Sequence, residues 1–513
     1  MFETAEAVRE AYERGKEHHR RLNLYTQTRQ NYDFYEGRQW EGLISKATPP
    51  VYNIIKHIVA FKFNTMSMQD IQTVFSSDEE EYQEYANALN DYAKDLWQRA
   101  KLHDNLRLFA KGGCIAGDDY MYFADESEVQ LIDNVDIHFA DEQLTEVQKQ
   151  KYILIVERLF VEDVKKVAEF NNLDEGLIST IVSDEELEEG KNIIEVEGNK
   201  KCTCFLVMWK DNGTVHSLRA TQNVIYSPEK DSRLKLYPIV GLTVNPRKGS
   251  RRGIGEVQPL IANQININKT IYRRTEAVKD VCFPKVVYNG QVITNPELLD
   301  AVGAKIKVAS GSMELRNILQ YIQPSYIGSA AKELNDELIL ISKELNGSGD
   351  GATGQINPEK ASGEAIRATT QQASIAASET SAAYRQAVED IGAIIIDLWR
   401  VYHYTDKDGL KFEGKLIPLE AFDALKFDIN ISPATPYDKL AVEQSLKELF
   451  ISGHISFEEF VEALDENGNM PKAQLQAIID KRAKAEENQY KLIIEELQKR
   501  LAYYEAQSVT ASP

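Results

Sequence analysis

The sequence predicts an α+β protein that is mainly helical, and three observations support this fold class. Residues 358–404 place apolar or small side chains every three or four positions, which is the period of one face of a long α-helix. Residues 120–219 contain short runs of β-branched and aromatic residues that are typical of strands. Residues 436–513 return to a helical pattern. A chain of 513 residues, 43% hydrophobic and 27% charged, has room for two to four globular domains.

The N-terminal half combines helices with strands. Residues 1–36 predict a charged helix that closes on Gly37, a residue suited to helix C-termini. The acidic run from Asp78 to Glu84 favours the start of another helix, which continues through Trp97 and, after a break, from Leu102 to Ala110. Lys111, Gly112, Gly113 and Gly117 then interrupt it. The other elements expected here are helices at 51–66 and 102–110 and strands at 72–75, 120–123, 129–132, 152–157, 201–209 and 214–219.

A basic, glycine-rich joint at 244–255 leads into a helix predicted at 256–281, and Pro284 ends that helix. Asn263, Gln264, Asn266 and Asn268 give the helix a polar but uncharged face. The segment is strongly basic in a protein whose net charge is −21. Its basic residues are Arg247, Lys248, Arg251, Arg252, Lys269, Arg273, Arg274, Lys279 and Lys285.

The residues from 285 onward predict a small β structure, then two helices joined by a glycine-rich loop. A hairpin is expected at 285–294 with its tight turn at Asn289–Gly290, and a strand at 305–308. A helix at 329–345 then leads to the loop at 346–357. Pro358 begins the long helix, which at 1.5 Å per residue would run about 70 Å. A flexible loop beside such a helix favours contact with a moving or variable object; a long surface helix after an ordinary loop is the alternative.

The C-terminal part begins with strands expected at 411–417 and 425–431. Helices are predicted at 438–451, at 456–464 with a capping box from Ser456 to Glu459, and from Pro471 to about Gln507.

The sequence contains no catalytic constellation that fits a known chemistry. Residues 249–255 lack the final Gly-Lys-Ser/Thr of a phosphate-binding loop, and 465–469 place the glycine of a calcium loop two positions early. Asp118 and Asp119 can ligate a metal, but a turn before a strand is the simpler interpretation. We therefore expect a protein that is not an enzyme and holds neither a metal nor a cofactor.

Charge and cysteine usage limit the other classes. A chain this acidic is not expected to grip DNA tightly, because that affinity comes mostly from neutralised phosphates. Four scattered cysteines do not form a disulfide framework, and Cys202-Thr-Cys204 lacks a partner pair at zinc-finger spacing. The charged N-terminus and the absence of a long apolar run predict a soluble protein made in the cytoplasm, with no membrane partner.

The order of these features resembles the portal proteins of tailed bacteriophages. A mixed α/β body leads through a glycine joint into a helix, a small β insertion, a returning helix, a glycine-rich loop, a very long helix and a helical C-terminus. Residues 32–40 (Tyr-Asp-Phe-Tyr-Glu-Gly-Arg-Gln-Trp), followed by Asn53, look like the N-terminal region of that family, and 106–123 is similar to another recurrent piece. The resemblance covers nearly the whole chain.

The resemblance implies a ring, usually of twelve copies, at the portal vertex of the capsid in the virion. Such a ring is the channel for packaging and ejection of double-stranded DNA. Its expected partners are the terminase large subunit, the head–tail adaptor and the major capsid or scaffolding protein. The implied parts are an N-terminal α/β wing region (1–255), a stem helix (256–282), a β-containing clip (283–328), a returning stem helix (329–345), a tunnel loop (346–357), the long helix with wing strands (358–435) and a helical crown with a frayed tail (436–513).

The resemblance also assigns candidate sites. The tunnel loop that would face DNA comprises Asn346, Gly347, Ser348, Gly349, Asp350, Gly351, Ala352, Thr353, Gly354 and Gln355; it has no Lys or Arg, which suits weak contact with sliding DNA. Clip residues for docking the motor or adaptor are Lys285, Tyr288, Asn289, Gly290, Gln291, Lys305 and Lys307.

The basic residues from Arg247 to Lys279 are candidate contacts to DNA, to a neighbouring subunit or to capsid protein. Solvated charges or salt bridges between subunits are the alternative. Two other functions stay open: a helical oligomeric scaffold or adaptor of a virion without a DNA channel, and a nucleic-acid enzyme.

Overall fold

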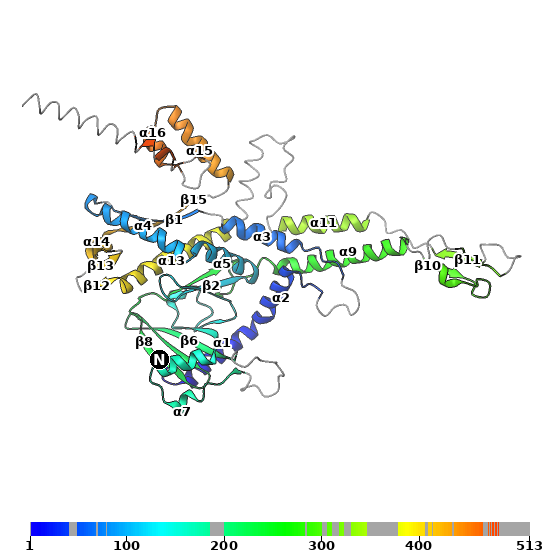
Figure 1. Ribbon diagram of the computed structural model, residues 1–513, viewed down its shortest axis with the longest axis horizontal. Coiled ribbons are helices and arrows are strands. Elements are labelled where there is room, and N and C mark those ends of the chain that lie inside the picture. Colours follow the sequence, from blue (N-terminus) through cyan, green and yellow to red (C-terminus); the bar gives the residue numbers. More distant parts are fainter. Residues whose placement is uncertain are drawn as a thin grey trace, which may run out of the picture. The chain divides into compact units, whose positions relative to one another are not determined.

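The computed structural model describes most of the chain up to residue 464. The described residues are 2–40, 49–67, 70–77, 79–184, 200–282, 285–299, 305–309, 318–322, 330–345, 378–405, 409–412, 414–432, 436–464 and 470, with 472, 474–476, 478–479 and 481. They form an α+β, mainly helical fold, as predicted (Figure 1). The chain divides into two compact units: Met1–Ser67 with Thr73–Ile429, and Met68–Gln72 with Asn430–Pro513.

A five-stranded antiparallel sheet forms one layer of the first unit. Its order is β4 (Ile137–Phe139), β5 (Tyr152–Phe160), β6 (Lys201–Asp211), β7 (Thr214–Thr221) and β8 (Ile225–Asp231). Helix α1 (Ala5–Arg21) packs through Val8 and Ala11 in a core with Phe205 and Trp209 of β6. Helices α6 (Val161–Phe170) and α7 (Glu175–Ile178) enclose a second core that contains Cys204. Because both cores include residues of β6, its apolar run from Cys204 to Trp209 is buried throughout.

A three-stranded antiparallel sheet, in the order β3 (Val129–Ile132), β2 (Asp118–Phe123) and β9 (Ile239–Thr243), forms a second layer of this unit. Helices α5 (Leu102–Ala116) and α13 (Ser378–Tyr402) pack against it. The Asp397 carboxylate on α13 accepts the backbone N–H groups of Lys235 (2.7 Å) and Leu236 (2.9 Å), which fixes the segment before β9.

The first unit contains further elements outside these two sheets. They are α2 (Leu24–Glu36), α3 (Ile54–Ser67), η1 (Glu80–Tyr82), α4 (Gln83–Arg99), η2 (Val147–Lys149), η3 (Gln258–Leu260), α9 (Ile261–Cys282), β10 (Lys285–Tyr288), η4 (Pro296–Leu298), β11 (Leu319–Ile322), α11 (Ala330–Leu345), β12 (Tyr404–Thr405), β13 (Gly409–Phe412), β14 (Lys415–Pro418) and α14 (Leu419–Ala424). Strand β1 (Asp70–Ser76) pairs with β15 (Lys426–Ser432).

Two glycines that locally predict a helix break lie inside α5. The helix runs through Gly112 and Gly113 and ends at Gly117, whose φ is +111°. A Cβ on Gly112 would lie 2.0 Å from Asp119 Oδ2, so this glycine permits close packing rather than a break. Asp118 and Asp119 are likewise buried in β2 and not in a turn, and burial raises the pKa of Asp119 well above its usual value.

The single helix predicted for residues 1–36 is two helices. The chain turns at Asn23, which has a left-handed conformation with φ 54°, and α2 then ends on Gly37 as expected. Asparagine tolerates that conformation better than most residues. Of the long helix predicted from Pro358 to Tyr404, the described residues contain α13; residues 358–377 lie outside the described part.

The second unit contains α15 (Pro436–Ile451) and α16 (Phe457–Glu462). The predicted capping box is confirmed: Glu459 N–H donates to Ser456 Oγ (3.2 Å), and Ser456 N–H donates to the Glu459 carboxylate (2.7 Å). Phe460 and Leu464 pack with Leu446 in a small core. The helix predicted at 471–507 lies mostly outside the described residues.

Candidate functional site

Helices α9 and α11 form an antiparallel pair that carries a small β structure between its outer ends. Asn263, near the start of α9, donates through Nδ2 to Ser342 Oγ near the end of α11 (3.2 Å). The chain therefore leaves along α9, passes through β10 and β11, and returns along α11. In Figure 1 the two helices run side by side, and β10 and β11 lie beyond the end of α9.

This helix pair exposes many large apolar side chains. Leu345 is 67% exposed and Val278 is 61% exposed, values far above those of core residues. The exposed set on the two helices is Val278, Val281, Leu334, Leu340, Ile341 and Leu345. Exposed apolar side chains in number often mark sites that other molecules cover. Here Leu340, Ile341 and Leu345 lie near the end of α11, and Val278 and Val281 lie near the end of α9. The pair is therefore a candidate assembly surface.

The inner end of α9 is fixed by amide side chains. Gln264 Nε2 donates to Tyr52 O (2.7 Å), and Gln264 Oε1 accepts from Ile54 N–H (3.1 Å). Asn268 Oδ1 accepts from Tyr52 N–H (3.1 Å), and its Nδ2 donates to Gln39 Oε1 (2.5 Å). Gln264 and Asn268 are buried, so they bind groups of their own chain and not a neighbouring subunit.

The described part of the predicted clip differs from the expected hairpin. Strand β10 pairs with β11, in the register Lys285↔Ile322 to Tyr288↔Leu319, and not with residues 291–294. Asn289 still makes a turn, because its side chain accepts from Gln291 N–H (3.0 Å).

Residues 305–308 contribute a bridge from Val308 to Ile293 in place of the predicted strand. A small core of Val292, Ile293 and Ile318 holds these segments together. Among the docking candidates, Lys285, Tyr288, Gly290, Gln291, Lys305 and Lys307 are exposed, and Asn289 is half-buried.

The basic residues from Arg247 to Lys279 do not form one group. Arg247, Lys248, Lys269 and Arg273 are exposed and Arg274 is half-buried. Exposed Lys279 pairs with Glu276 (2.9 Å). Arg251 and Arg252 are buried, so the prediction that these two contact DNA or a neighbouring subunit is wrong. Arg251 lies over the Phe139 ring, 4.4 Å from its centre, and donates to the backbone carbonyl of Thr145.

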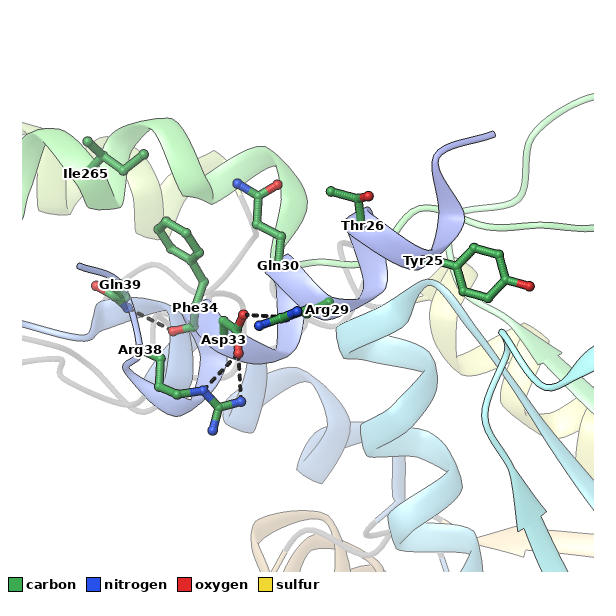
Figure 2. Close-up of a pocket in the computed structure, with 9 residues that line it drawn as sticks. All are labelled: Tyr25, Thr26, Arg29, Gln30, Asp33, Phe34, Arg38, Gln39 and Ile265. Carbon is green, nitrogen blue, oxygen red and sulfur yellow. Dashed lines mark hydrogen bonds and ion pairs between the residues drawn. The ribbon is translucent and has the colours of Figure 1, made fainter. Parts of the chain in front are cut away.

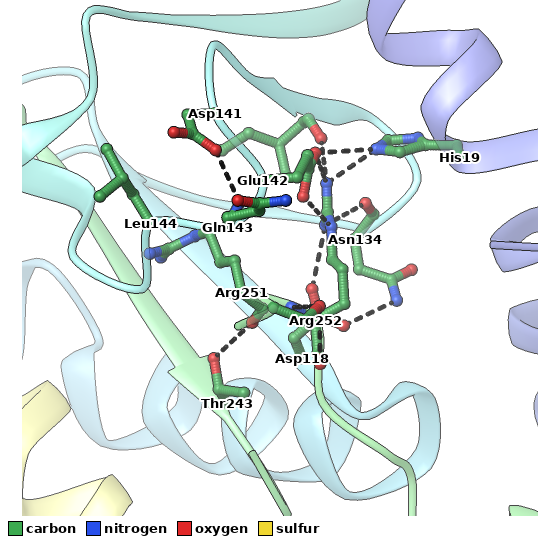
Figure 3. Close-up of polar contacts among 12 residues, drawn as sticks. His19, Asp118, Asn134, Asp141, Glu142, Gln143, Leu144, Thr243, Arg251 and Arg252 are labelled. Carbon is green, nitrogen blue, oxygen red and sulfur yellow. Dashed lines mark hydrogen bonds and ion pairs between the residues drawn. The ribbon is translucent and has the colours of Figure 1, made fainter. Parts of the chain in front are cut away.

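Arg252 is the centre of a buried polar cluster (Figure 3). It donates to both oxygens of Glu142 (2.9 Å each) and to Asp118 Oδ2 (3.0 Å). It also donates to the backbone carbonyls of Asn134 and Ile137 (2.8 Å each). Although burial opposes it, the positive charge of Arg252 holds the pKa of the Glu142 carboxyl well below its usual range. The cluster joins the segment before α9 to both sheets.

Sequence reasoning missed this cluster because its members are far apart in the chain. Arg252 is 110 residues from Glu142 and 134 residues from Asp118. The one local signal was an arginine pair inside a glycine-rich joint, which is equally typical of an exposed basic patch.

A hollow of about 650 Å³ lies between α2 and the inner end of α9 (Figure 2). Phe34 and Ile265 contribute its apolar lining, and Arg29 and Arg38 its charge. Both arginines approach one carboxylate: Arg38 Nη2 lies 2.7 Å from Asp33 Oδ1, and Arg29 Nε lies 3.7 Å from Asp33 Oδ2. The two cations are therefore paired within the chain.

Other predicted features are located as follows. The tunnel loop at 346–357 lies outside the described residues. Within the described ranges, no three His, Cys, Asp or Glu side chains are grouped so that they could hold a metal ion. None of the described helices is long and apolar enough to cross a bilayer. Cys114, Cys202, Cys204 and Cys282 are free thiols.

Comparisons with known proteins give likenesses to solved structures but not to sequences. No known family matches the chain, and no curated protein sequence matches it. Among solved structures, the chain is similar to a chain in the neck of an empty GTA particle computed with C6 symmetry. The TM-score is 0.34 at 8% identity, over 76% of this chain and 85% of that chain. A likeness at this TM-score carries no argument about fold or function.

Proposed function

We propose that this chain is a portal protein: a subunit of a ring at one capsid vertex of a tailed bacteriophage, through which viral DNA is packaged and ejected. The observation that carries the proposal is the α9–α11 pair, which holds β10 and β11 at its outer end and exposes six large apolar side chains. The order of elements is that expected of stem, clip and returning stem.

The physical argument concerns what covers this apolar surface. Leaving several Leu, Ile and Val side chains in water costs roughly 25 cal/mol for every Å² of apolar area that a partner would bury. Copies arranged head to tail around an axis cover such a surface on every subunit, and they close into a ring when the rotation between neighbours completes a full turn. A ring of helix pairs has its inner ends fixed in the body and its outer ends free to dock other proteins.

The remaining assignments follow from the same proposal. The tunnel loop from Asn346 to Gln355 lines the channel and touches DNA weakly. The exposed clip residues dock the terminase large subunit and, later, the head–tail adaptor. The chain has no catalytic step, and energy for DNA movement comes from the docked motor. The second unit serves as the crown.

Electron microscopy of the purified full-length chain, with its mass from light scattering, tests the proposal. Rings with a central hole and a mass near a dozen copies of 58.1 kDa are the expected result. Compact particles without a channel, across salt concentrations and with capsid or scaffolding protein added, would refute it and favour the virion scaffold.

A matched pair of variants tests the assembly surface. Val278→Asp puts a carboxylate into the apolar set and is expected to abolish rings, because a buried unpaired charge is strongly unfavourable. Asn266→Asp puts the same carboxylate at an exposed polar position of the same helix and is expected to leave rings intact. Equal assembly by the two variants would contradict the role of α9 in ring formation.

A further inference from the structure

Helix α1 rests directly on the imidazole of His138 in β4. A Cβ on Gly15 would lie 2.6 Å from His138 Nδ1, so the helix backbone approaches as closely as only glycine allows. On either side of this contact, the His19 ring stacks on His138 with 4.3 Å between ring centres, and the Tyr12 ring meets it edge-on at 5.3 Å. His19 of α1 and His138 of β4 therefore form a polar part of the contact between the helix and the sheet.

These imidazoles are buried with few hydrogen-bond partners. His138 is 1% exposed, and neither of its ring nitrogens has a partner. His19 is fully buried; its Nε2 accepts from Arg252 Nη2 (2.8 Å), and its Nδ1 has no partner (Figure 3). Because Nε2 accepts a hydrogen bond from a cation, the His19 imidazole is neutral in this arrangement.

The carboxylate beside the pair, Glu142, is already bonded to Arg252 through both oxygens. Lys16 and His18 come from α1, Arg252 from the segment before α9, and Glu142 from the segment after β4. Glu142 Oε1 lies 3.4 Å from His19 Nε2, but both oxygens of this carboxylate already bond Arg252. A proton on His138 would therefore add a second buried cation close to Arg252.

The direction of titration follows from this environment. Burial lowers the pKa of His138 from 6.5 to about 3, and the neighbouring His19 and Arg252 contribute to that lowering. Burial also lowers the pKa of His19, and the nearby Glu142 carboxylate opposes this lowering. With α1 undocked, water reaches both rings, and they return to ordinary values. Acid therefore favours the undocked helix.

We propose that the stacked His19–His138 pair is an acid-sensitive latch, which holds α1 on the five-stranded sheet at neutral pH and releases it when the pH falls. Release separates α1 from Phe205 and Trp209 and removes the His19 contact from the Arg252 cluster. Helix α13 packs against the other sheet and stays in place. This latch does not depend on the portal proposal.

Hydrogen exchange measured by mass spectrometry on the full-length chain tests the latch. For His138 alone, a pKa of 6.5 in the open form and about 3 in the docked form raises the undocked population about 30-fold at pH 5 relative to pH 8. Protection of peptides from α1 is expected to fall by at least that factor, after correction for intrinsic exchange, while α13 peptides keep their protection.

Variants separate titration from packing. His138→Gln keeps a polar side chain of similar size that does not titrate, and it is expected to reduce the pH dependence of α1 protection to the part due to His19. If the glutamine variant loses α13 protection, His138→Leu replaces it as the variant that cannot titrate. His57→Gln, at an exposed position of α3, is the control and is expected to retain the full wild-type change. Three results would each overturn the latch. The first is α1 protection in the wild type that does not change from pH 8 to pH 5, and the second is a joint loss of protection in α1 and α13. The third is a pH-dependent change of α1 protection in the His138 variants that is as large as in the wild type.

Discussion

Replacing Arg252 with methionine tests how much the stability of the first unit depends on one buried cation. Met retains much of the aliphatic volume but none of the five N–H donors. Glu142 and Asp118 would then be buried without their counter-charge, and the carbonyls of Asn134 and Ile137 would lose a donor. Removing one partner of a buried ion pair typically costs about 3–5 kcal/mol. Since Arg252 is only 2% exposed, solvent screening does not reduce that figure.

The assay is equilibrium urea unfolding of the full chain, followed by circular dichroism. Arg252→Met is expected to lower the unfolding free energy of the first unit by about 3–5 kcal/mol. Arg247→Met makes the same substitution at an exposed position five residues earlier and is expected to stay within about 0.5 kcal/mol of wild type.

A double variant measures the pair itself. Glu142→Gln removes the carboxylate that Arg252 would leave uncompensated, so Arg252→Met should cost less in that background than in wild type. If Arg252→Met alone costs under about 1 kcal/mol, or if the two substitutions simply add, the cluster does not have the importance that its contacts indicate.

Three further substitutions have defined outcomes. Gln264→Ala removes the side-chain acceptor of the N–H of buried Ile55 in the first turn of α3 and should cost about 1–3 kcal/mol in urea unfolding, with no loss for the exposed control Asn266→Ala. Ser456→Ala removes the cap of α16 and should lower the thermal stability of the second unit by about 1 kcal/mol; an unchanged melting curve would contradict the cap. The pKa of His403 is raised, because the hydrogen bond between its ring and Glu126 outweighs the opposing effect of burial. The His403–Glu126 interaction therefore stabilises the fold fully below about pH 6.5, and this stabilisation is lost as the pH rises through the raised pKa. Glu126→Gln should remove that difference between unfolding free energies measured at pH 6 and pH 8.

Local signals in the sequence predicted the elements that depend on neighbouring residues. The capping box at Ser456 and the helix end at Gly37 are set by contacts within a few positions, and both are confirmed. The strands of the five-stranded sheet were also predicted in part, because the apolar run of β6 is long and both of its faces are covered. The order of helix, small β structure and returning helix could be read in the same way.

Features that depend on distant residues could not be predicted. Glycine at 112 signals a helix break when read locally, yet the side chain that requires it is Asp119 on the adjacent strand. Strand β10 has a good turn sequence after it at Asn289–Gly290, but its partner lies some thirty residues later in β11. Arg252 reads as an exposed basic residue, because the two carboxylates that bury it lie more than a hundred positions earlier.

The two ends of α9 differ in what holds them, and this difference bears on how the chain assembles. At the inner end, Gln264 and Asn268 are buried and bonded to groups of their own chain, while the Arg252 cluster fixes the segment that precedes the helix. At the outer end, Val278 and Val281 are exposed and contribute little to the stability of the isolated subunit. Substitutions at the inner end should therefore change the stability of the monomer, whereas substitutions at the outer end should change assembly alone. In the ring proposed above, such a subunit would be rigid before it meets its neighbours, so that assembly would lose little conformational entropy at the root of the helix pair.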